Sequence, residues 1–332
     1  MRTRFSMLLA LLCLLPALVM ASTPRGYKTV PTGYNLFEII YANTRGDADT
    51  DSPLPGSMLS IDRHTTILRY VHYFDWNGRF SGFAFMLPVV DQELTFSNPL
   101  PFVPTSVIGD QSGIGDPTFV LASNIFGQPA MDLQEYVAHF RSGKPVHESS
   151  LNWSLWGTAP MGKYESASLG NAGENRWTIK PEINFMHIAD KVWFEANAAV
   201  TLFTDNSDYL VTGRLEQEPL LTLEGHLSVD VPIKLTSKVT IPAWASLSLY
   251  GYIGGETSVN GISRNDTADD WALSTNLYLR LHKQYAFRLF YTKTIKHEPG
   301  RFDTDTAGFR AIGVSNRTEA VYAASRLKLV KV

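Results

Sequence analysis

Most of the chain alternates between apolar and polar residues in short segments, a pattern typical of β-strands whose two faces meet different surroundings. Between positions 271 and 281, apolar side chains hold nearly every odd position, and polar or small residues hold most of the even ones. A period of two places these sets on opposite faces of a strand. The alternation recurs at 179–185, 192–202, 221–231, 245–253 and 285–294, and more weakly at 36–44, 66–74, 80–88, 118–126, 151–159 and 319–332. The pattern predicts about twelve strands of roughly 9–14 residues, the length of a tilted strand that crosses a membrane.

The connections between these segments alternate between short and long. Short connections occur at 75–78, 189–191 and 283–284, and long polar ones at 46–60, 91–113, 162–175, 205–214, 256–269 and 298–317. An up-and-down barrel in an outer membrane has short periplasmic turns and longer outer loops. The predicted fold is therefore all-β, a transmembrane antiparallel β-barrel with both chain ends on the periplasmic side if the strand number is even.

One connection that should be short, at 128–149, is long and has helical character. Its apolar residues Leu133, Tyr136, Val137 and Phe140 recur at helical spacing. Asp132, just before them, is a suitable N-cap. We expect a short amphipathic helix that covers the barrel end, with a position at the inner mouth, a position at the membrane interface and a lumen plugged by residues 128–149 as the alternatives.

The first residues have the features of a secretion signal. A basic start and an apolar stretch at 7–19 precede small residues ending at Ala21. The stretch is too short to cross a bilayer comfortably. We expect residues 1–21 to be a removed signal peptide, and residues 22–332 to be one barrel domain exported through the periplasm to the outer membrane of a Gram-negative-type cell.

Composition removes several classes of function. The single cysteine, Cys13, lies in the predicted signal, so the mature chain has neither disulfides nor thiolate chemistry. A net charge of −3 gives no electrostatic footprint for nucleic acid. The sequence also lacks a nucleophile elbow, a zinc-protease motif and a phosphate loop. We therefore expect no enzyme activity, no cofactor and no bound metal.

Charged side chains on the polar faces, together with aromatic residues near strand ends, favour a membrane barrel over a soluble sandwich. The polar faces then line the lumen. The lumen-lining candidates are Glu38, Lys180, Glu182, Trp193, Glu195, Glu224, His226, Tyr250, Tyr278, Arg280 and Arg288. A wall that mixes both charges with aromatic rings suits polarisable solutes better than strong ion selection.

A second group of polar residues falls at the predicted outer ends of strands. The outer-mouth candidates are Asp116, Glu174, Arg176, Asp205 and Glu256. Many of their neighbours are turn formers, so turn geometry alone accounts for most of these runs. The functional alternative is a polar network of Glu174, Arg176 and Asp205 that tunes the pore mouth.

Several short runs follow one another in a specific order between about positions 30 and 270. They include Gly113-Ile114-Gly115-Asp116-Pro117, Leu121-Ala122-Ser123-Asn124-Ile125-Phe126-Gly127-Gln128-Pro129-Ala130, Pro160-Met161-Gly162-Lys163-Tyr164, Glu174-Asn175-Arg176-Trp177, Phe203-Thr204-Asp205-Asn206-Ser207-Asp208 and Gly254-Gly255-Glu256-Thr257-Ser258-Val259-Asn260-Gly261. Together they resemble the MetA-pathway of phenol degradation family of outer-membrane barrels. The resemblance implies a barrel with a transport role tied by name to aromatic-compound breakdown, and it implies no catalytic or binding residues.

The pattern thus predicts a passive channel for small aromatic or apolar solutes, because about twelve strands enclose a lumen narrower than that of a large porin. The expected partners are membrane lipid, a small-molecule solute and the outer-membrane assembly machinery. Two other functions stay open. One is a structural or adhesive barrel with a plugged lumen. The other is a hydrolase, which requires His226 in register with a serine and a carboxylate on neighbouring strands.

Overall fold

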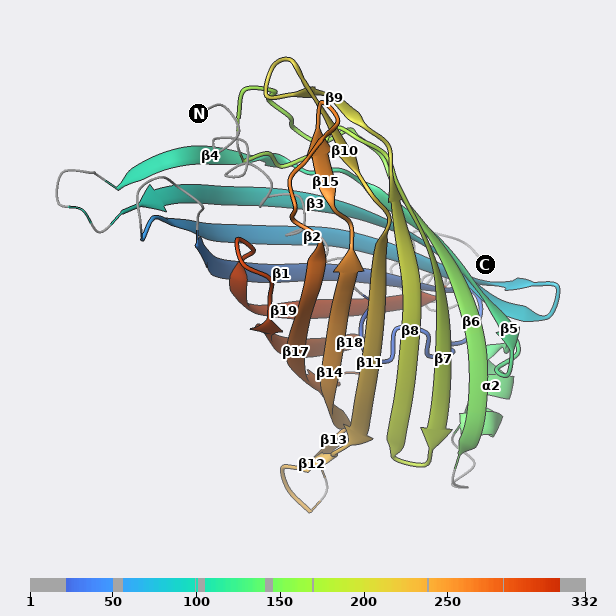
Figure 1. The fold of residues 1–332 in the computed structure, drawn as a ribbon. Helices are drawn as coiled ribbons and strands as arrows, with labels where there is room; N and C mark the ends of the chain where they lie inside the picture. Colours follow the sequence, from blue (N-terminus) through green and yellow to red (C-terminus); the bar gives the residue numbers. More distant parts are fainter. Residues whose placement is uncertain are drawn as a thin grey trace, which may run out of the picture.

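The structure is a computed structural model that describes residues 22–49, 56–98, 100, 105–140, 146–168, 170–237, 239–282 and 284–316. Within them, twelve antiparallel strands form a ring that the pairing of β2 with β3 closes (Figure 1). The ring strands are β1 (Tyr34–Asp49), β2 (Met58–Trp76), β3 (Arg79–Ser97), β5 (Thr118–Phe126), β6 (His147–Thr158), β7 (Thr178–Ala189), β8 (Val192–Phe203), β11 (Leu220–Asp230), β14 (Ala243–Gly254), β17 (Ala268–Leu279), β18 (Tyr285–Lys296) and β19 (Asp303–Asn316). The predicted all-β barrel is confirmed.

The two ends of the barrel differ in their connections. At the end taken as periplasmic, β2 and β3 are joined by Asn77 and Gly78, and β7 and β8 by Asp190 and Lys191. Asn77 and Gly78 have φ angles of 52° and 79°, the left-handed pair that a tight hairpin turn requires. The longer connections lie at the opposite, outer end, as the spacing of the strands predicts.

The strands alternate between lipid-facing apolar residues and inward residues, as β8 illustrates. Val192 and Phe194 are 42% and 46% exposed, whereas Trp193 and Glu195 between them are 6% and 1% exposed. The exposed apolar side chains form the surface that a membrane barrel presents to lipid. On this strand, the structure therefore has the outward-facing and inward-facing residues that the sequence pattern predicts.

The strands near the N-terminus are longer than predicted. β2 and β3 each have 19 residues, which corresponds to about 60 Å of strand. The segment 91–113, predicted as a loop, instead contains the end of β3 and the added strand β4 (Ser106–Ile114), which pairs with β3. The prediction was wrong here because Asp91 and Glu93 are typical loop residues. The hydrocarbon core of a bilayer is about 30 Å thick, so part of these strands lies outside it. In that part, polar residues such as Asp91 and Glu93 can belong to a strand.

The last ring strand also differs from the prediction. β19 lies within the predicted loop 298–317 and pairs with both β1 and β18. The predicted strand at 319–332 lies outside the described residues, as do residues 1–21. In β19, small residues such as Ala307 and Ala311 share a face with Phe309, so the apolar alternation is weak and the sequence pattern misses the strand.

Additional strands occur at both ends (Figure 1). Four of them form a small sheet within the outer connections: β9 (Asn206–Tyr209), β10 (Gly213–Gln217), β15 (Thr257–Val259) and β16 (Ile262–Ser263). At the periplasmic end, β12 (Ile233–Lys234) and β13 (Thr240–Ile241) form a short hairpin. The predicted outer loops at 205–214 and 256–269 are therefore partly ordered by pairing with each other.

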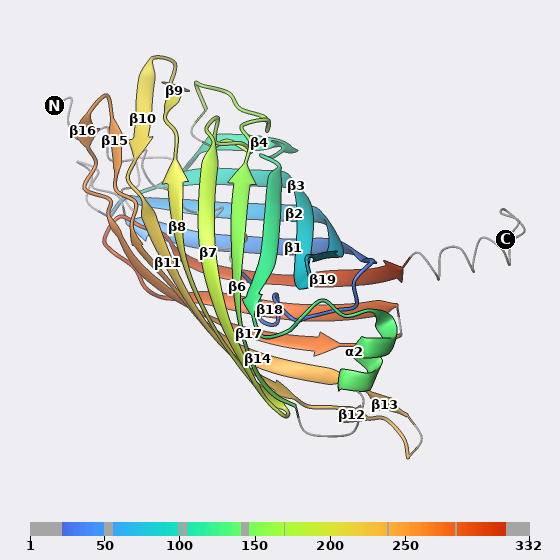
Figure 2. The same cartoon turned by 90° about the vertical axis from the view of Figure 1, so that its right-hand side faces the viewer.

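The predicted helix is present as α2 (Leu133–Phe140). It begins with a capping box, in which Glu135 N donates to Asp132 Oδ1 at 2.8 Å and Asp132 N donates to Glu135 Oε2 at 2.9 Å. Figure 2 places α2 at the periplasmic rim of the barrel, and Leu133 on its apolar face is 46% exposed. No helix in the described part of the chain is long and apolar enough to span a membrane.

Candidate functional site

Residues 22–33, here called the lumen segment, lie inside the barrel before β1 begins. At the inner end of the segment, Ser22 is 4% exposed. Its backbone N donates to Glu224 Oε1 at 3.1 Å, and its hydroxyl donates to Glu182 Oε1 at 2.6 Å. Both carboxylates belong to the inward faces of ring strands, so the segment is held by the wall.

Arg25 is the main anchor of the lumen segment. Its guanidinium lies 4.3 Å from the ring centroid of Trp193 and 5.0 Å from that of Trp244, and it pairs with Asp230 at 2.6 Å. Its backbone N donates to Glu195 Oε2 at 2.6 Å. Aromatic faces and a carboxylate together make a strong guanidinium site. These contacts hold Arg25 at a φ of 61°, a conformation that residues other than glycine seldom adopt.

The rest of the lumen segment runs to the periplasmic mouth. Tyr27 bonds Glu182 and Ser154 through its hydroxyl. Thr32 N donates to the carbonyl of Met131 at 2.9 Å, and Gly33 N donates to the carbonyl of Tyr73 at 2.8 Å. The connection that precedes α2 therefore supports the lumen segment from the periplasmic side.

A ladder of asparagines crosses four neighbouring strands on the inner wall and ends on a carboxylate of the fifth, β11. Asn124, Asn152, Asn184 and Asn197 lie opposite one another in the strand registers of β5, β6, β7 and β8. Each donates from its Nδ2 to the Oδ1 of the next, at 3.0, 3.0 and 2.5 Å. The last, Asn197, donates to Glu224 Oε2 at 2.9 Å. One carboxylate therefore ends the ladder and also accepts the hydrogen bond from Ser22.

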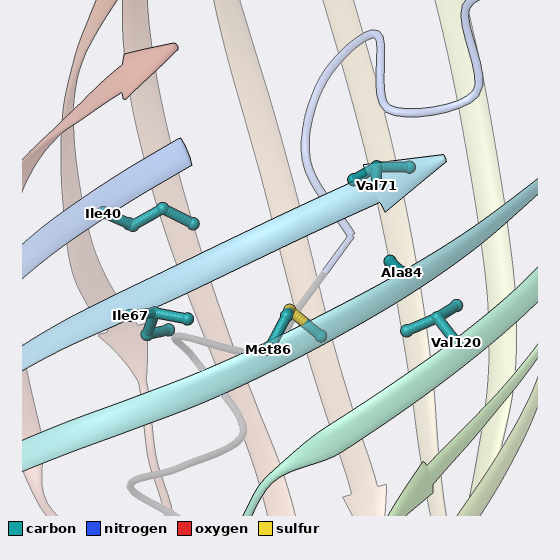
Figure 3. Packing of buried hydrophobic residues seen from close by; sticks show 6 residues of the cluster. All are labelled: Ile40, Ile67, Val71, Ala84, Met86 and Val120. Carbon is teal, nitrogen blue, oxygen red and sulfur yellow. The ribbon is translucent and has the colours of Figure 1, made fainter. Parts of the chain in front are cut away.

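The neighbouring sector of the inner wall is apolar (Figure 3). Six buried residues from β1, β2, β3 and β5 form one cluster there: Ile40, Ile67, Val71, Ala84, Met86 and Val120. All six line a cavity of about 90 Å³ between the wall and the lumen segment. This is several times the roughly 10–15 Å³ that one water needs, so the cavity has room for a small organic group.

Charged residues lie beside this apolar sector. Glu38 on β1 accepts from Arg69 Nη1 at 2.8 Å and from Arg310 Nη1 at 3.3 Å. Arg288 on β18 is directly opposite Arg310 in the strand register and is 6% exposed. Arg69 and Arg310 line the same cavity as the apolar cluster.

At the outer end, the structure brings together part of the proposed mouth network. Arg176, which is 1% exposed, pairs with Glu174 at 2.8 Å and packs over the ring of Phe203 at 4.5 Å. Asp116 accepts from Glu174 N at 2.6 Å. Asp205 is not a member of this group, because it pairs with Arg214 in the outer connection.

The remaining mouth candidate, Glu256, lies in the β14–β15 connection, where its carboxylate accepts hydrogen bonds from the hydroxyls of Ser263 and Thr267. It therefore orders its own loop. The sequence did not show that Glu256 and Asp205 have partners other than Arg176. Those partners are set by the pairing of the outer connections with one another.

The predicted lumen residues fall into two groups. Nine of the eleven are inward residues that are buried or largely buried: Glu38, Lys180, Glu182, Trp193, Glu195, Glu224, His226, Tyr250 and Arg288. Tyr278 is half-buried and stacks on Trp244 with ring centroids 5.2 Å apart. Arg280 is exposed and lies one residue beyond the end of β17, so it is placed at the periplasmic edge of the barrel wall.

His226 meets the register requirement for a hydrolase but not the hydrogen-bond requirement. It lies opposite Glu195 on β8 and Ser248 on β14, and its Nε2 is 3.4 Å from Glu224 Oε2. Neither ring nitrogen of His226 has a hydrogen-bond partner within the described residues, and neither does the Ser248 hydroxyl. A nucleophile that does not reach its base is not activated, so these residues carry no argument for hydrolysis.

Sequence reasoning missed the lumen segment and the asparagine ladder. The segment contains Pro24, Gly26 and Gly33 and has no periodicity, so its sequence resembles a plain lead into the first strand. The ladder depends on which residues of neighbouring strands lie opposite each other, whereas the period of two in one strand indicates only the face that each residue occupies. A usable signal was the recurrence of asparagine on polar strand faces, as at Asn184 and Asn197.

The fold, the lipid-facing apolar surface and the filled interior together define an outer-membrane β-barrel. The family model described as "Putative MetA-pathway of phenol degradation" matches residues 42–310, and the chain belongs to this family. The family resemblance found in the sequence is confirmed. Among curated proteins, none matches the chain.

Solved structures with a similar fold are outer-membrane barrels. The crystal structure of an outer membrane channel from Pseudomonas putida F1 has a TM-score of 0.69 and 17% identity, over 89% of this chain and 100% of that chain. The translocator domain of the autotransporter NalP from Neisseria meningitidis has a TM-score of 0.44 and 7% identity, over 90% and 94% of the two chains. A FadL homologue of Pseudomonas aeruginosa has a TM-score of 0.41 and 8% identity, over 85% and 90%. At 17% identity, the likeness to the Pseudomonas putida channel concerns the fold.

Proposed function

We propose that the protein is an outer-membrane channel for small aromatic or apolar solutes, and that the lumen segment forms its narrowest part. The observation that carries the proposal is the apolar sector of the inner wall. Ile67 and Val71 point inward although they are apolar, whereas the inner wall of a channel for hydrophilic solutes is polar. An apolar wall beside a cavity favours an apolar solute because both lose contact with water together.

The division of the interior supports the same proposal. Many of the hydrogen bonds of the lumen segment go to the polar inner wall of β7, β8 and β11, here called the polar sector, through Glu182, Glu195 and Glu224. The segment therefore narrows the lumen from that side, and the cavity lies between it and the apolar sector. A solute that moves along the apolar sector passes the lumen segment without breaking the contacts between the segment and the carboxylates of the wall.

The test is solute-driven swelling of liposomes that contain the purified protein, after heat-dependent gel mobility has verified a closed barrel. Phenyl glucoside is compared with maltose, because the sugar of the former keeps it from crossing lipid unaided. We expect faster swelling with phenyl glucoside. Absence of swelling with either solute, from a verified barrel, would instead favour the structural barrel with a plugged lumen.

Two isosteric variants locate the path. Val71→Thr combined with Val120→Thr adds two hydroxyls to the apolar sector at almost constant volume, and we expect it to lower the phenyl glucoside rate about tenfold relative to maltose. The matched control is Thr222→Val, which makes the reverse exchange at a buried inward position of the polar sector. If both variants changed the ratio equally, the apolar sector would not be the path.

A further inference from the structure

The charged group beside the apolar sector is unbalanced. Two guanidinium groups, those of Arg69 and Arg310, pair with the one carboxylate of Glu38, and a third, that of Arg288, belongs to the residue opposite Arg310 in the strand register. Arg288 makes no ion pair with any residue that the structure describes. The side chains of Glu38 and Arg310 are 3% and 10% exposed, so water screens their charges poorly.

The hydrogen-bond donors of this group are also incompletely used. The Nε atoms of Arg69, Arg288 and Arg310 are buried and have no hydrogen-bond partner in the part of the chain that the structure describes. A guanidinium has five N–H donors, and Glu38 accepts from one Nη atom each of Arg69 and Arg310. Buried donors without acceptors are costly, which favours an additional acceptor at this position.

The surroundings define the rest of a ligand. Arg69 and Arg310 line the cavity together with the cluster of Figure 3 and with Tyr73, Phe80 and Trp156. A ligand that pairs with the arginines and also fills the apolar part of the cavity therefore has an anionic oxygen head and an apolar body. A carboxylate suits arginine because its two oxygens match the planar donors of a guanidinium.

We propose that Arg69 and Arg310 form a binding subsite for the carboxylate of a small organic acid, whose apolar body packs against the apolar sector. Arg288 adds positive charge to the subsite through its position opposite Arg310. The inference rests on the proposed function, because the cavity belongs to the proposed solute path. It adds to the proposed apolar solutes a class that the channel binds preferentially, the apolar monoanions.

The test is equilibrium dialysis of the purified full-length protein in a neutral detergent, with three radiolabelled probes. Benzoate carries both head and body, benzyl alcohol carries the body alone, and acetate carries the head alone. We expect benzoate to bind about tenfold or more tightly than either other probe, the factor that one charge-assisted hydrogen bond supplies. Benzyl alcohol binding as tightly as benzoate would overturn the role of the arginines, and acetate doing so would leave a plain anion site.

Two variants change the subsite in opposite directions. Arg310→Met removes one guanidinium, and we expect it to abolish the preference for benzoate while benzyl alcohol binding persists. Glu38→Gln keeps a hydrogen-bonding side chain but removes the competing carboxylate, and we expect it to tighten benzoate binding by about tenfold. Because Glu38→Gln is predicted to increase affinity, a folding defect does not mimic the expected result. Weaker benzoate binding in Glu38→Gln would overturn the proposal.

The matched control is Arg214→Met, an exposed arginine of the outer connection that pairs with Asp205. It should leave the affinity for all three probes unchanged. Failure of the subsite and failure of the channel are distinguishable. Benzoate binding without phenyl glucoside swelling would retain the subsite and remove the channel, whereas swelling without a benzoate preference would do the reverse.

Discussion

Asn197 donates a hydrogen bond of 2.9 Å to Oε2 of Glu224, while Oε1 of the same carboxylate accepts one of 3.1 Å from the backbone N of Ser22. Glu224 is 5% exposed, so both bonds form away from bulk water. A buried carboxylate needs several donors to offset its lost hydration. The wall and the lumen segment supply them jointly, so the stability of each depends on the other.

The asparagine ladder should behave as a cooperative unit. Asn184→Ala and Asn197→Ala each leave a buried partner without its hydrogen bond, and we expect each to lower the free energy of unfolding by about 1–3 kcal/mol. The double variant should lose at least about 0.5 kcal/mol less than the sum of the two single variants, because both substitutions remove the same hydrogen bond between Asn184 and Asn197. Urea unfolding in lipid bilayers measures both quantities.

Asn276→Ala is the control for the ladder. Asn276 is a buried inward asparagine on β17 whose side-chain atoms have no hydrogen-bond partner within the described residues. Its substitution should cost less than that of Asn184, and the double variant of Asn184 and Asn276 should be additive. Additivity of Asn184 with Asn197 as well would show that the ladder is not cooperative.

Removing the anchor of the lumen segment should widen the channel. Arg25→Ala deletes the contacts with Trp193, Trp244 and Asp230, so we expect single-channel conductance in planar bilayers to rise several-fold. Arg25→Lys keeps the charge but loses the planar stacking, and it should give an intermediate conductance. Wild-type conductance in Arg25→Ala would show that the lumen segment does not depend on this anchor.

The first mature residue should be Ser22, and its new α-ammonium should bind Glu224. Cleavage after Ala21 would turn the Ser22 backbone N into a charged group with three donors at the atom that already lies 3.1 Å from Glu224. We expect intact-mass analysis to give a chain starting at Ser22. Native reductive methylation of this amine should be about tenfold slower than in the unfolded chain.

A one-residue insertion separates specific binding of the amine from plain burial. One extra glycine between Ala21 and Ser22 moves the α-amine by up to about 3.6 Å and leaves every barrel residue intact. The amine should then be methylated faster in the native protein. Equal protection in both proteins, or a mature chain that starts elsewhere, would contradict the prediction.

The outer connection around Glu256 should loosen in acid. Hydrogen bonds from Ser263 and Thr267 lower the pKa of the Glu256 carboxyl below its ordinary value. A lowered pKa means that the contacts contribute stability at pH values above the ordinary pKa, and that this contribution is lost as the pH falls through the folded pKa. A carbon-13 NMR titration of the Glu256 carboxyl measures the shift, and Ser263→Ala should raise the pKa. No change in Ser263→Ala would assign the shift to other groups.

Strand periodicity was sufficient to predict the barrel but not the character of its whole interior. On β8, apolar Phe194 and charged Glu195 alternate, so the sequence shows which residue faces lipid. On β2, Ile67 and Val71 face inward while Leu68 faces outward, so both faces are apolar and the period-two signal disappears. The residues of the apolar sector all lie in segments whose alternation is weak in the sequence: 36–44, 66–74, 80–88 and 118–126.

Contacts between distant parts of the chain could not be predicted at all. The pairing of Arg25 with Asp230 joins residues 205 positions apart, and neither residue shows a local pattern that indicates the other. Arg280 was misplaced for a simpler reason, since the alternation seen at 271–281 continues for two residues beyond Leu279, where β17 ends. Strand ends are set by tertiary hydrogen bonding, which periodicity does not report.

The apolar sector and the asparagine ladder lie largely on different strands, and this separation has a consequence for how such a protein diversifies. Residues such as Val71 and Met86 can be exchanged for others of similar volume without breaking any bond of the ladder. Selection on solute preference and selection on folding therefore act on largely independent positions. Under the proposed function, a change of solute preference would therefore leave the hydrogen bonds that assemble the barrel in place.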